Sequence, residues 1–564
     1  MAGLVPAISL RNARCQPKRD ARDKPGHDNG KIMANSELMR PVSAAAVKAM
    51  LGDGQELALV DVREELTFSK NHLLWARSVP LSRLELNFSR LVPRQTARIV
   101  LCDDIDGLAE RAASILARAG YSDLSFLEGG VAAWEQAGFV LFSGMHVPSK
   151  AFGEFVEHDS GTPNVSAEEL NALREAGTDL VVLDSRPLDE FSRISIPGGI
   201  NVPGAELVLR ARDLAPSPET MIVVNCAGRT RSIIGAQSLI NAGTPNKVVA
   251  LRNGTMGWHL AGFTCASGAD VRAPNPSQDA LKWSKPAAEA VARKFKVEHA
   301  DPATLERWRK DDARTLYLFD VRDPAEYEAG HLPGAISAPG GQLVQATDTY
   351  AGTLGARIVL YDDKLVRALM TASWLKQMGW KDVYVLEAAG SDAETEKGWP
   401  QRGVLGQMAD ADAQIEAKAL SELLNGDGAT VLDLARSPDY RKGHIPGAWF
   451  AIRSRLKKAL SKFPLPKELV LTSEDGALAA LAVADARAIA KCPVRFLRGG
   501  TAAWKAAGLP FATDGKLADQ PVDVWLKPYE QASDSEAAMN AYLSWEVDLL
   551  ERIKRDGTTH FLHA

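Results

Sequence analysis

The sequence predicts an α/β fold: four tandem small domains, each a doubly wound parallel sheet, followed by a C-terminal helix. Three observations predict it: the length, a repeated pair of apolar strand ends, and the alternation of strand-like with helix-like segments. The 564 residues correspond to three to five domains, since a domain averages about 150 residues. Short apolar strands that alternate with helices form βα units, with helices on both faces of a parallel sheet.

The repeat is visible at two strand ends in every copy. The first apolar strand ends at Asp61, Asp184, Asp320 and Asp433, and the second ends at Asp103, Cys226, Asp362 and Ser473. The two ends are 42 residues apart in the first three copies and 40 apart in the fourth. A turn rich in Pro and Gly lies between them, and a Gly-rich turn with a following Trp closes three of the copies. Such regular spacing indicates four copies of one structural unit.

We expect the copies at residues 37–145, 160–270, 290–405 and 410–513. Residues 1–36 are predicted to be a disordered arm or a mis-assigned start, because residues 1–32 hold seven Lys or Arg, three Asp and no periodic apolar face. In the tail, residues 514–564, Ser533 and Glu536 form a predicted capping box. The apolar face of that helix is predicted to be Met539, Leu543, Val547 and Leu550. We expect the helix to pack on the fourth copy rather than to act in chemistry.

Composition and charge argue against several classes of protein. Hydrophobic residues make up 46% and charged residues 24%, with a formal net charge of −5, as in an average globular chain. A chain with this charge balance has no overall positive potential to attract nucleic acid or an acidic membrane surface, so neither is expected as a partner. No apolar run reaches the ~20 residues of a membrane-spanning helix. Five scattered cysteines indicate neither a disulfide framework nor a zinc site, so we expect a cytoplasmic location and no metal or cofactor.

Cys226 is the residue best suited to covalent chemistry. It ends an apolar strand and precedes a Gly-containing turn and a helix predicted to start near Thr230 or Ser232. The turn amides and the positive end of the helix dipole favour a thiolate, and Arg229 and Arg231 add positive charge. Ligands of open α/β sheets bind beyond the carboxyl ends of the strands, where Cys226 is expected to lie.

The four copies resemble rhodanese homology domains. The resemblance rests on the Asp-x-Arg strand end, the "GHLPGA" and "GHIPGA" turns, the loop "CAGRTR" and the closing "GG-x-x-x-W", and it covers roughly residues 37–513. It implies sulfurtransferase chemistry at Cys226. In that family the loop cysteine takes the outer sulfur of a donor, carries it as a persulfide and passes it to cyanide or a thiol. The implied partners are a small sulfur-containing anion and a thiol or protein sulfur acceptor.

The resemblance and the same physics suggest roles for the rest of the loop. Backbone amides stabilise an anion on sulfur as an oxyanion hole does on oxygen, and Gly228 lets the chain turn tightly. The predicted anion-stabilising residues are Ala227, Gly228, Thr230 and Ser232. Arg229 and Arg231 are the predicted substrate-binding residues, because guanidinium groups bind oxyanions. A basic loop favours thiosulfate or a thiol persulfide over mercaptopyruvate, whose family members carry an uncharged loop.

The other three copies lack the nucleophile and are predicted to be inactive. Asp103 and Asp362 carry carboxylates, which cannot accept sulfane sulfur, and Ser473 has no base beside it. Residues shared by active and inactive copies are interpreted as structural. These are the strand-end pairs Asp61/Arg63, Asp184/Arg186 and Asp320/Arg322, and Trp134, Trp258 and Trp504. The turn residues His331 and His444 occur only in the inactive copies and are also interpreted as structural. We expect ion pairs of Arg186 with Glu190 and of Arg322 with Glu326, and Trp258 is also a candidate for the pocket wall.

Two alternatives to an active sulfurtransferase stay open. In the first alternative, the chain is a rhodanese-domain scaffold, or a sulfur or redox sensor, without turnover, and its inactive copies recruit partners. A phosphatase or arsenate reductase is less favoured, because the phosphate loop of such enzymes is longer than the four residues between Cys226 and Arg231. Tandem copies tend to pack in pairs, so the first and the third or fourth copies are candidates for covering the pocket of the second.

Overall fold

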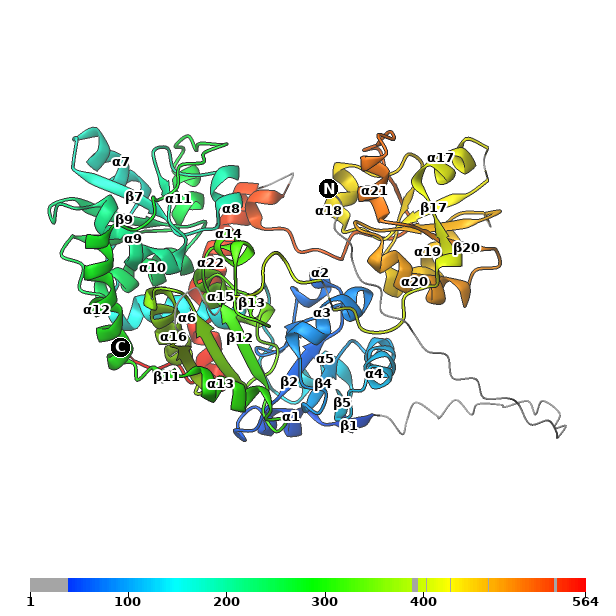
Figure 1. Cartoon of the computed structure of the whole chain (residues 1–564), viewed down its shortest axis with the longest axis horizontal. Coiled ribbons are helices and arrows are strands. Elements are labelled where there is room, and N and C mark those ends of the chain that lie inside the picture. Colours follow the sequence, from blue (N-terminus) through cyan, green and yellow to red (C-terminus); the bar gives the residue numbers. More distant parts are fainter. Residues whose placement is uncertain are drawn as a thin grey trace, which may run out of the picture.

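The structure, a computed structural model, describes residues 39–387, 394–401, 403–426, 428–464, 466–531 and 535–563. It contains four parallel sheets, one in each predicted copy, which we number as domains 1 to 4 in chain order (Figure 1). The predicted fold is therefore confirmed, including the C-terminal helix. The predicted arm lies outside the described residues. Among the helices that are described, none combines the length and apolar character needed to cross a bilayer.

Domains 1 and 2 have the same strand order. The sheet of domain 1 runs β1 (Arg40–Val42), β5 (Leu124–Leu127), β4 (Ile99–Cys102), β2 (Ala58–Asp61), β3 (Arg77–Ser78). Its helices are α1 (Ala44–Met50), α2 (Glu65–Phe68), α3 (Leu84–Leu91), α4 (Leu108–Arg118) and α5 (Gly130–Gln136). The sheet of domain 2 runs β6 (Asn164–Val165), β10 (Val248–Leu251), β9 (Met221–Asn225), β7 (Leu180–Asp184), β8 (Ile200–Asn201). Its helices are α7 (Ala167–Glu175), α8 (Leu188–Arg193), α9 (Leu207–Leu214), α10 (Thr230–Asn241) and α11 (Gly254–Leu260).

Domains 3 and 4 repeat this order, and domain 4 adds one edge strand. The sheet of domain 3 runs β11 (Glu298–Ala300), β15 (Val383–Leu386), β14 (Arg357–Tyr361), β12 (Leu316–Asp320), β13 (Ile336–Ser337). Its helices are α13 (Pro302–Arg309), α14 (Pro324–Ala329), α15 (Gly340–Gln345) and α16 (Val366–Gln377). The sheet of domain 4 runs β16 (Gln414–Ile415), β20 (Val494–Leu497), β19 (Leu469–Thr472), β17 (Thr430–Asp433), β18 (Trp449–Phe450), β21 (Lys516–Leu517). Its helices are α17 (Ala417–Asn425), α18 (Ser437–Lys442), α19 (Leu456–Ala459), α20 (Ala477–Arg487) and α21 (Gly500–Ala506).

Three further α-helices do not belong to the four domains: α6 (Val147–Ser160), α12 (Gln278–Lys294) and α22 (Ser535–Asp556). The apolar runs of the sequence form the central strands. All five residues of β9 are buried, and β9 pairs in parallel with β7 and β10. A strand covered on both faces needs such a continuous apolar run. Cys226, the next residue, therefore lies at the carboxyl edge near the centre of the sheet.

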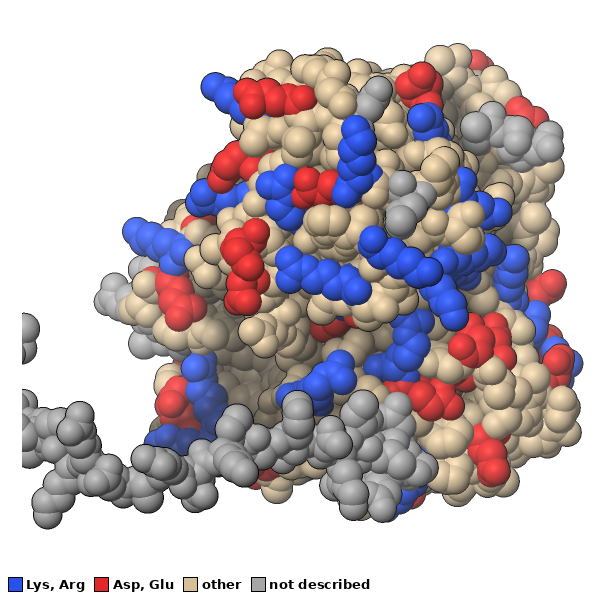
Figure 2. All heavy atoms as spheres, turned by 90° about the vertical axis from the view of Figure 1, so that its right-hand side faces the viewer, with Lys and Arg blue, Asp and Glu red and all other residues tan. Residues whose placement is uncertain are grey.

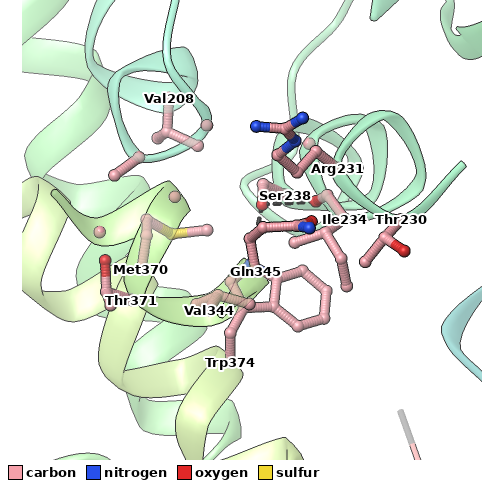
Figure 3. A pocket seen from close by; sticks show the side chains of 15 residues that line it. Val208, Thr230, Arg231, Ile234, Ser238, Val344, Gln345, Met370, Thr371 and Trp374 are labelled. Atoms are coloured by element: carbon pink, nitrogen blue, oxygen red, sulfur yellow. Dashed lines mark hydrogen bonds between the residues drawn. The ribbon is translucent and has the colours of Figure 1, made fainter. Parts of the chain in front are cut away.

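Domains 2 and 3 pack on each other through one shared hydrophobic core. Their backbones approach closely: a Cβ added to Gly341 would lie 2.9 Å from the backbone nitrogen of Gly204. A small cavity of about 30 Å³ lies at this interface, between α10 and α16, and Figure 3 shows the side chains that line it. Trp374 of α16 donates a hydrogen bond of 2.8 Å to the hydroxyl of Ser238 on α10. Polar and apolar contacts thus join domain 2 to domain 3.

Domain 4 contacts domain 1. Arg453 donates two hydrogen bonds of 2.8 Å to Glu85, and Arg83 donates one of 2.9 Å to Glu474. Leu86 of domain 1 belongs to the hydrophobic core of domain 4. Figure 2 shows the side of the molecule that includes domain 4, where Lys and Arg side chains form a band with Asp and Glu among them. Domain 1 therefore contacts domain 4, and it also contacts domain 3, where the side chain of Glu56 accepts hydrogen bonds from Arg314 and Thr315.

The C-terminal helix does not pack on domain 4, so that prediction is wrong. Figure 1 shows α22, in red, beside α6 and apart from domain 4. Leu549 and Ile553 pack with Val147 and Ala151 of α6. Val547 is 50% exposed and does not lie on the buried face, which consists of Met539, Leu543, Glu546, Leu549, Ile553 and Asp556. Ser533 of the predicted capping box lies outside the described residues. An apolar pattern indicates that a helix face is buried but not which element covers it.

The two predicted ion pairs are also wrong. Arg186 pairs with Asp184 at 2.7 Å, and Arg322 pairs with Asp320 at 2.6 Å and with Glu394 at 2.7 Å. The guanidinium groups reach the nearby strand-end carboxylates, so Glu190 and Glu326 are left for other arginines, described below. The structural interpretation of the turn residues is confirmed. His331 and His444 are buried and stack on Tyr327 and Tyr440, and Trp134, Trp258 and Trp504 lie in the hydrophobic cores.

Candidate active site

Cys226 lies in the short loop between β9 and α10. It is 2% exposed, and α10 begins at Thr230, one of the two predicted starts. The Cys226 thiol donates to the hydroxyl oxygen of Ser232 at 3.5 Å, and that hydroxyl donates to the carbonyl of Arg229 at 2.8 Å. The loop therefore curls around the sulfur, with the N-terminus of α10 beside it.

The Gly-rich turn that closes each repeat holds this loop in place. The amides of Thr255 and Met256 donate to the carbonyls of Cys226 and Ala227 at 2.8 and 2.9 Å. Gly254, at the start of α11, has φ +54°, and a Cβ there would overlap the carbonyl of Cys226. A glycine is therefore required for the two backbones to approach. Its position is matched in domains 1 and 4 by Gly130 and Gly500, where an added Cβ would likewise overlap the carbonyls of Asp103 and Ser473.

The strand-end pair supports the loop from the other side. Arg186 donates two hydrogen bonds to Asp184, of 2.9 and 2.7 Å. The side-chain amide of Asn225 donates to the same carboxylate at 2.7 Å and to the hydroxyl of Thr255 at 3.0 Å. Asn225 directly precedes Cys226, so the structural pair Asp184 and Arg186 orients the residue before the nucleophile.

Two domains that lack the cysteine show what the loop amides bind. In domains 1 and 3 the carboxylate at the nucleophile position accepts hydrogen bonds from the amides of the second and sixth following residues. The donors are Ile105 and Ala109 for Asp103, at 3.0 Å each, and Lys364 and Ala368 for Asp362, at 2.6 and 2.7 Å. The equivalent residues in domain 2 are Gly228 and Ser232. The loop is therefore built to surround a negatively charged group.

The cavity at Cys226 has a volume of about 70 Å³ and is lined by four parts of the chain. Domain 2 contributes the loop and Met256, and domain 3 contributes Gln345. The start of α6 contributes Met145, His146 and Lys150, and the C-terminal segment contributes Trp525, Lys527, Pro528, Tyr529 and Tyr542. Only the loop residues were predicted from the sequence. Apart from Met256, which belongs to the closing Gly-rich turn, the others lie outside the repeat motifs, and no local pattern indicates that they meet there.

Carboxylates already bind both predicted substrate-binding arginines. Arg229 donates two hydrogen bonds of 2.7 Å to Glu154 on α6 and also pairs with Glu157. Arg231 donates to Glu190 at 2.7 Å and to Gln342 of domain 3 at 3.0 Å. Burial opposes the charge of Arg231, but Glu190 holds the pKa of Arg231 above its usual value. Arg231 therefore stays charged, and the carboxylates of Glu154 and Glu157 likewise hold the pKa of Arg229 above its usual value against burial.

Helix α22 reaches the loop through one buried carboxylate. Glu546 is 0% exposed, pairs with Lys150 at 3.1 Å, and accepts hydrogen bonds from Thr230 and Tyr542 at 3.3 and 3.1 Å. Met539 and Leu543 of the same helix pack on Met256. Burial and the neighbouring Glu546 raise the pKa of Tyr542, so its hydroxyl stays protonated. The C-terminal helix is thus part of the wall around Cys226.

A model of the rhodanese-like domain matches residues 43–137, 166–261, 301–389 and 416–507. The chain belongs to the rhodanese-like domain family. It is similar along most of its length to a solved structure, the thiosulfate sulfurtransferase of Pseudomonas aeruginosa. The two are 49% identical, with a TM-score of 0.90, and the match covers 93% of this chain and 99% of that one. The arrangement of all four rhodanese-like domains is therefore shared between the two proteins.

Curated relatives match over the length of a single rhodanese-like domain. An uncharacterized protein from Synechocystis sp. is 34% identical over 116 residues, which is 21% of this chain and 64% of that protein. An HTH-type transcriptional regulator from Mycobacterium tuberculosis is 34% identical over 113 residues, which is 20% of this chain and 49% of that protein. The chain thus spans about half to two thirds of the length of these relatives, and its similarity to them shows the domain alone.

Proposed function

We propose that the protein is a sulfurtransferase that moves a sulfane sulfur from an anionic donor, thiosulfate or a persulfide, through a Cys226 persulfide to a thiol or cyanide acceptor. The observation that carries the proposal is the equivalence of Cys226 with the carboxylates of Asp103 and Asp362, which accept hydrogen bonds from the loop amides. A thiolate or persulfide anion at Cys226 takes the same place. The similarity to the thiosulfate sulfurtransferase of Pseudomonas aeruginosa supports the same chemistry.

Each half-reaction exchanges one S–S bond. The Cys226 thiolate attacks the outer sulfur of thiosulfate, the S–S bond of the donor breaks, and sulfite leaves with the bonding electron pair. The acceptor then attacks the outer sulfur of the persulfide, and the Cys226 thiolate leaves. The amides of Gly228 and Ser232 stabilise the negative charge on sulfur in both steps. A free thiol is required throughout, as the reducing conditions of a cytoplasm provide.

The two loop arginines take different parts in the proposal. Arg229 binds Glu154, Glu157 and Asn253, so it holds the loop against α6 and contributes charge. Arg231 uses its two terminal nitrogens for Glu190 and Gln342, and no described residue accepts from its Nε. A guanidinium with a remaining N–H group is suited to bind an oxyanion. We therefore assign the contact with the donor to Arg231.

Sulfur loading tests the proposal directly. Wild-type protein incubated with thiosulfate is expected to gain one sulfur atom by intact mass, because the persulfide forms on one residue, and to lose it on addition of cyanide. Cys226→Ser is expected to gain none, whereas Cys265→Ser, which changes a partly exposed cysteine outside the cavity, loads as wild type does. Loading of the Cys226→Ser protein contradicts the proposal. Loading of the wild type without release to cyanide or a thiol favours the sulfur-sensor alternative.

Replacing Gly254 with alanine is expected to lower sulfur transfer at least tenfold. The new Cβ overlaps the carbonyl of Cys226, so the loop has to move away from its position around the sulfur. Gly243→Ala is the matched control, because Gly243 also has positive φ, +72°, but has nothing within 4 Å of the added Cβ. The control loses about 1 kcal/mol of stability from backbone strain and keeps its activity. Steady-state rates at equal folded concentration distinguish the two; equal rates contradict the prediction.

A further inference from the structure

The chain returns from domain 4 to domain 2 and places Tyr529 in the wall of the Cys226 cavity. Tyr529 lies in a short 3₁₀ helix, η9 (Pro528–Glu530), whose Pro528 is buried. Two ion pairs attach this turn to α8 of domain 2: Lys527 with Glu190 at 3.0 Å, and Glu530 with Arg193. Since Glu190 is also the partner of Arg231, the turn is attached to the same carboxylate as the loop arginine.

The hydroxyl of Tyr529 is buried and has no hydrogen-bond partner among the described residues. Such a group costs about 1–3 kcal/mol, and native structures normally provide it with a partner. The second tyrosine of the cavity differs, since the hydroxyl of Tyr542 donates to Glu546 at 3.1 Å. Because Tyr529 lines the Cys226 cavity, a ligand bound in this cavity can accept the hydrogen bond of the Tyr529 hydroxyl.

The surroundings keep this hydroxyl a donor. Burial and the carboxylate of Glu190 raise the pKa of Tyr529, so the phenol stays protonated. A phenol O–H donates strongly to oxygen and weakly to sulfur. The cavity therefore presents the O–H of Tyr529 and the guanidinium of Arg231 to whichever group occupies it next to Cys226.

We infer that the Tyr529 hydroxyl donates a hydrogen bond to an oxygen of the sulfur donor and so selects donors that carry oxygen, such as thiosulfate, over oxygen-free polysulfide. The inference rests on the proposed function. With the outer sulfur at Cys226, the oxygens of thiosulfate face Tyr529 and Arg231. Negative charge on these oxygens grows as the S–S bond breaks and sulfite departs, so the hydrogen bond strengthens in the transition state. Tyr529 is thus a binding residue that acts on the leaving group.

Tyr529→Phe tests the inference, because it removes the hydroxyl and keeps the ring. We measure kcat and KM with cyanide as acceptor and with either thiosulfate or inorganic polysulfide as donor. With thiosulfate, kcat/KM is expected to fall about tenfold, the effect of one hydrogen bond worth about 1.4 kcal/mol, mainly through kcat. With polysulfide, kcat/KM is expected to stay within about twofold of wild type. Tyr384→Phe, on β15 outside the cavity, is the control and leaves both donors unaffected.

The outcomes separate this inference from the proposed function. A fall of equal size with both donors, or an unchanged rate with thiosulfate, overturns the assignment of Tyr529. If the wild type itself takes no sulfur from either donor, the proposed function fails whatever residue stands at position 529. Removing an unpartnered hydroxyl does not weaken the fold, so the melting temperature of Tyr529→Phe is expected to equal or exceed that of wild type. A lower melting temperature with equal losses for both donors indicates a structural role and also overturns the inference.

Discussion

Replacing Arg231 with methionine is expected to abolish measurable sulfur transfer and to destabilise the protein by about 3 kcal/mol. Glu190, which is buried, loses its principal partner and keeps only Lys527, at 3.0 Å. Removing one member of a buried ion pair is costly because the remaining charge is left poorly compensated. The pKa of Glu190 is held well below its usual value by Arg231 and Lys527 despite burial, so this carboxylate stays charged. Activity is lost because the donor loses its guanidinium contact.

Arg367 provides a matched control at the equivalent position of inactive domain 3. It lies five residues after Asp362, as Arg231 lies five residues after Cys226, and it is 0% exposed. It pairs with Glu326 at 2.6 Å and with Glu206 of domain 2 at 2.8 Å. Arg367→Met is therefore expected to cost as much stability as Arg231→Met, while the folded protein keeps its activity. Denaturant unfolding together with rates per folded molecule distinguishes them, and equal activity losses contradict the role of Arg231 in binding the donor.

Replacing Asp433 with asparagine is expected to stabilise domain 4 at pH 8. In domains 1 to 3 the strand-end aspartate pairs with an arginine two residues later, but in domain 4 that residue is Ala435. Asp433 is 0% exposed, accepts one hydrogen bond of 2.9 Å from the amide of Ala435, and its Oδ2 has no partner in the described part of the chain. An unpaired buried carboxylate is costly when it is charged.

The effect depends on pH with a definite sign. Burial raises the pKa of Asp433 from 3.8 to about 7, so the folded state binds the proton more tightly than the unfolded state. The protonated carboxyl therefore makes its full contribution to the free energy of unfolding below about pH 4, and this contribution is lost as the pH rises to about 7. This difference in pKa between the folded and unfolded states corresponds to a change on the order of 4 kcal/mol in the free energy of unfolding. Asparagine does not titrate, so the advantage of Asp433→Asn is expected to be largest at pH 8 and to vanish near pH 4.

Hydrogen exchange of the peptides that contain β17 and β19 measures this stability across pH. Asp320→Asn is the control, because Asp320 pairs with Arg322 and the substitution removes one of the two carboxylates that pair with this buried guanidinium. We expect Asp320→Asn to increase exchange in domain 3 at both pH values. If Asp433→Asn slows exchange in domain 4, relative to wild type, no more at pH 8 than at pH 4, the buried carboxylate does not destabilise domain 4 at pH 8.

Local pattern was sufficient to predict the repeat, its strand ends and the start of α10 to within two residues, near Thr230 or Ser232. Buried parallel strands need continuous apolar runs, and β9 has one. The proposed nucleophile follows from the same logic, since a cysteine at a strand end before a Gly-containing turn differs visibly from Asp103, Asp362 and Ser473 at the equivalent positions. The predicted ion pair of Arg186 with Glu190 failed because two candidate partners lay within reach and only geometry chooses Asp184.

The amino-acid sequence by itself determined four copies of one α/β unit and a single cysteine at the four equivalent ends of their second strands, because strand periodicity and loop composition are properties of neighbouring residues. Only the tertiary structure decided what surrounds that thiol. The cavity takes Gln345 from domain 3, Lys150 from α6, and Tyr529 and Tyr542 from the C-terminal segment. These contacts join residues hundreds of positions apart, and they depend on how amphipathic helices and paired domains bury their faces. A pattern within one segment shows that a face must be covered but not what covers it.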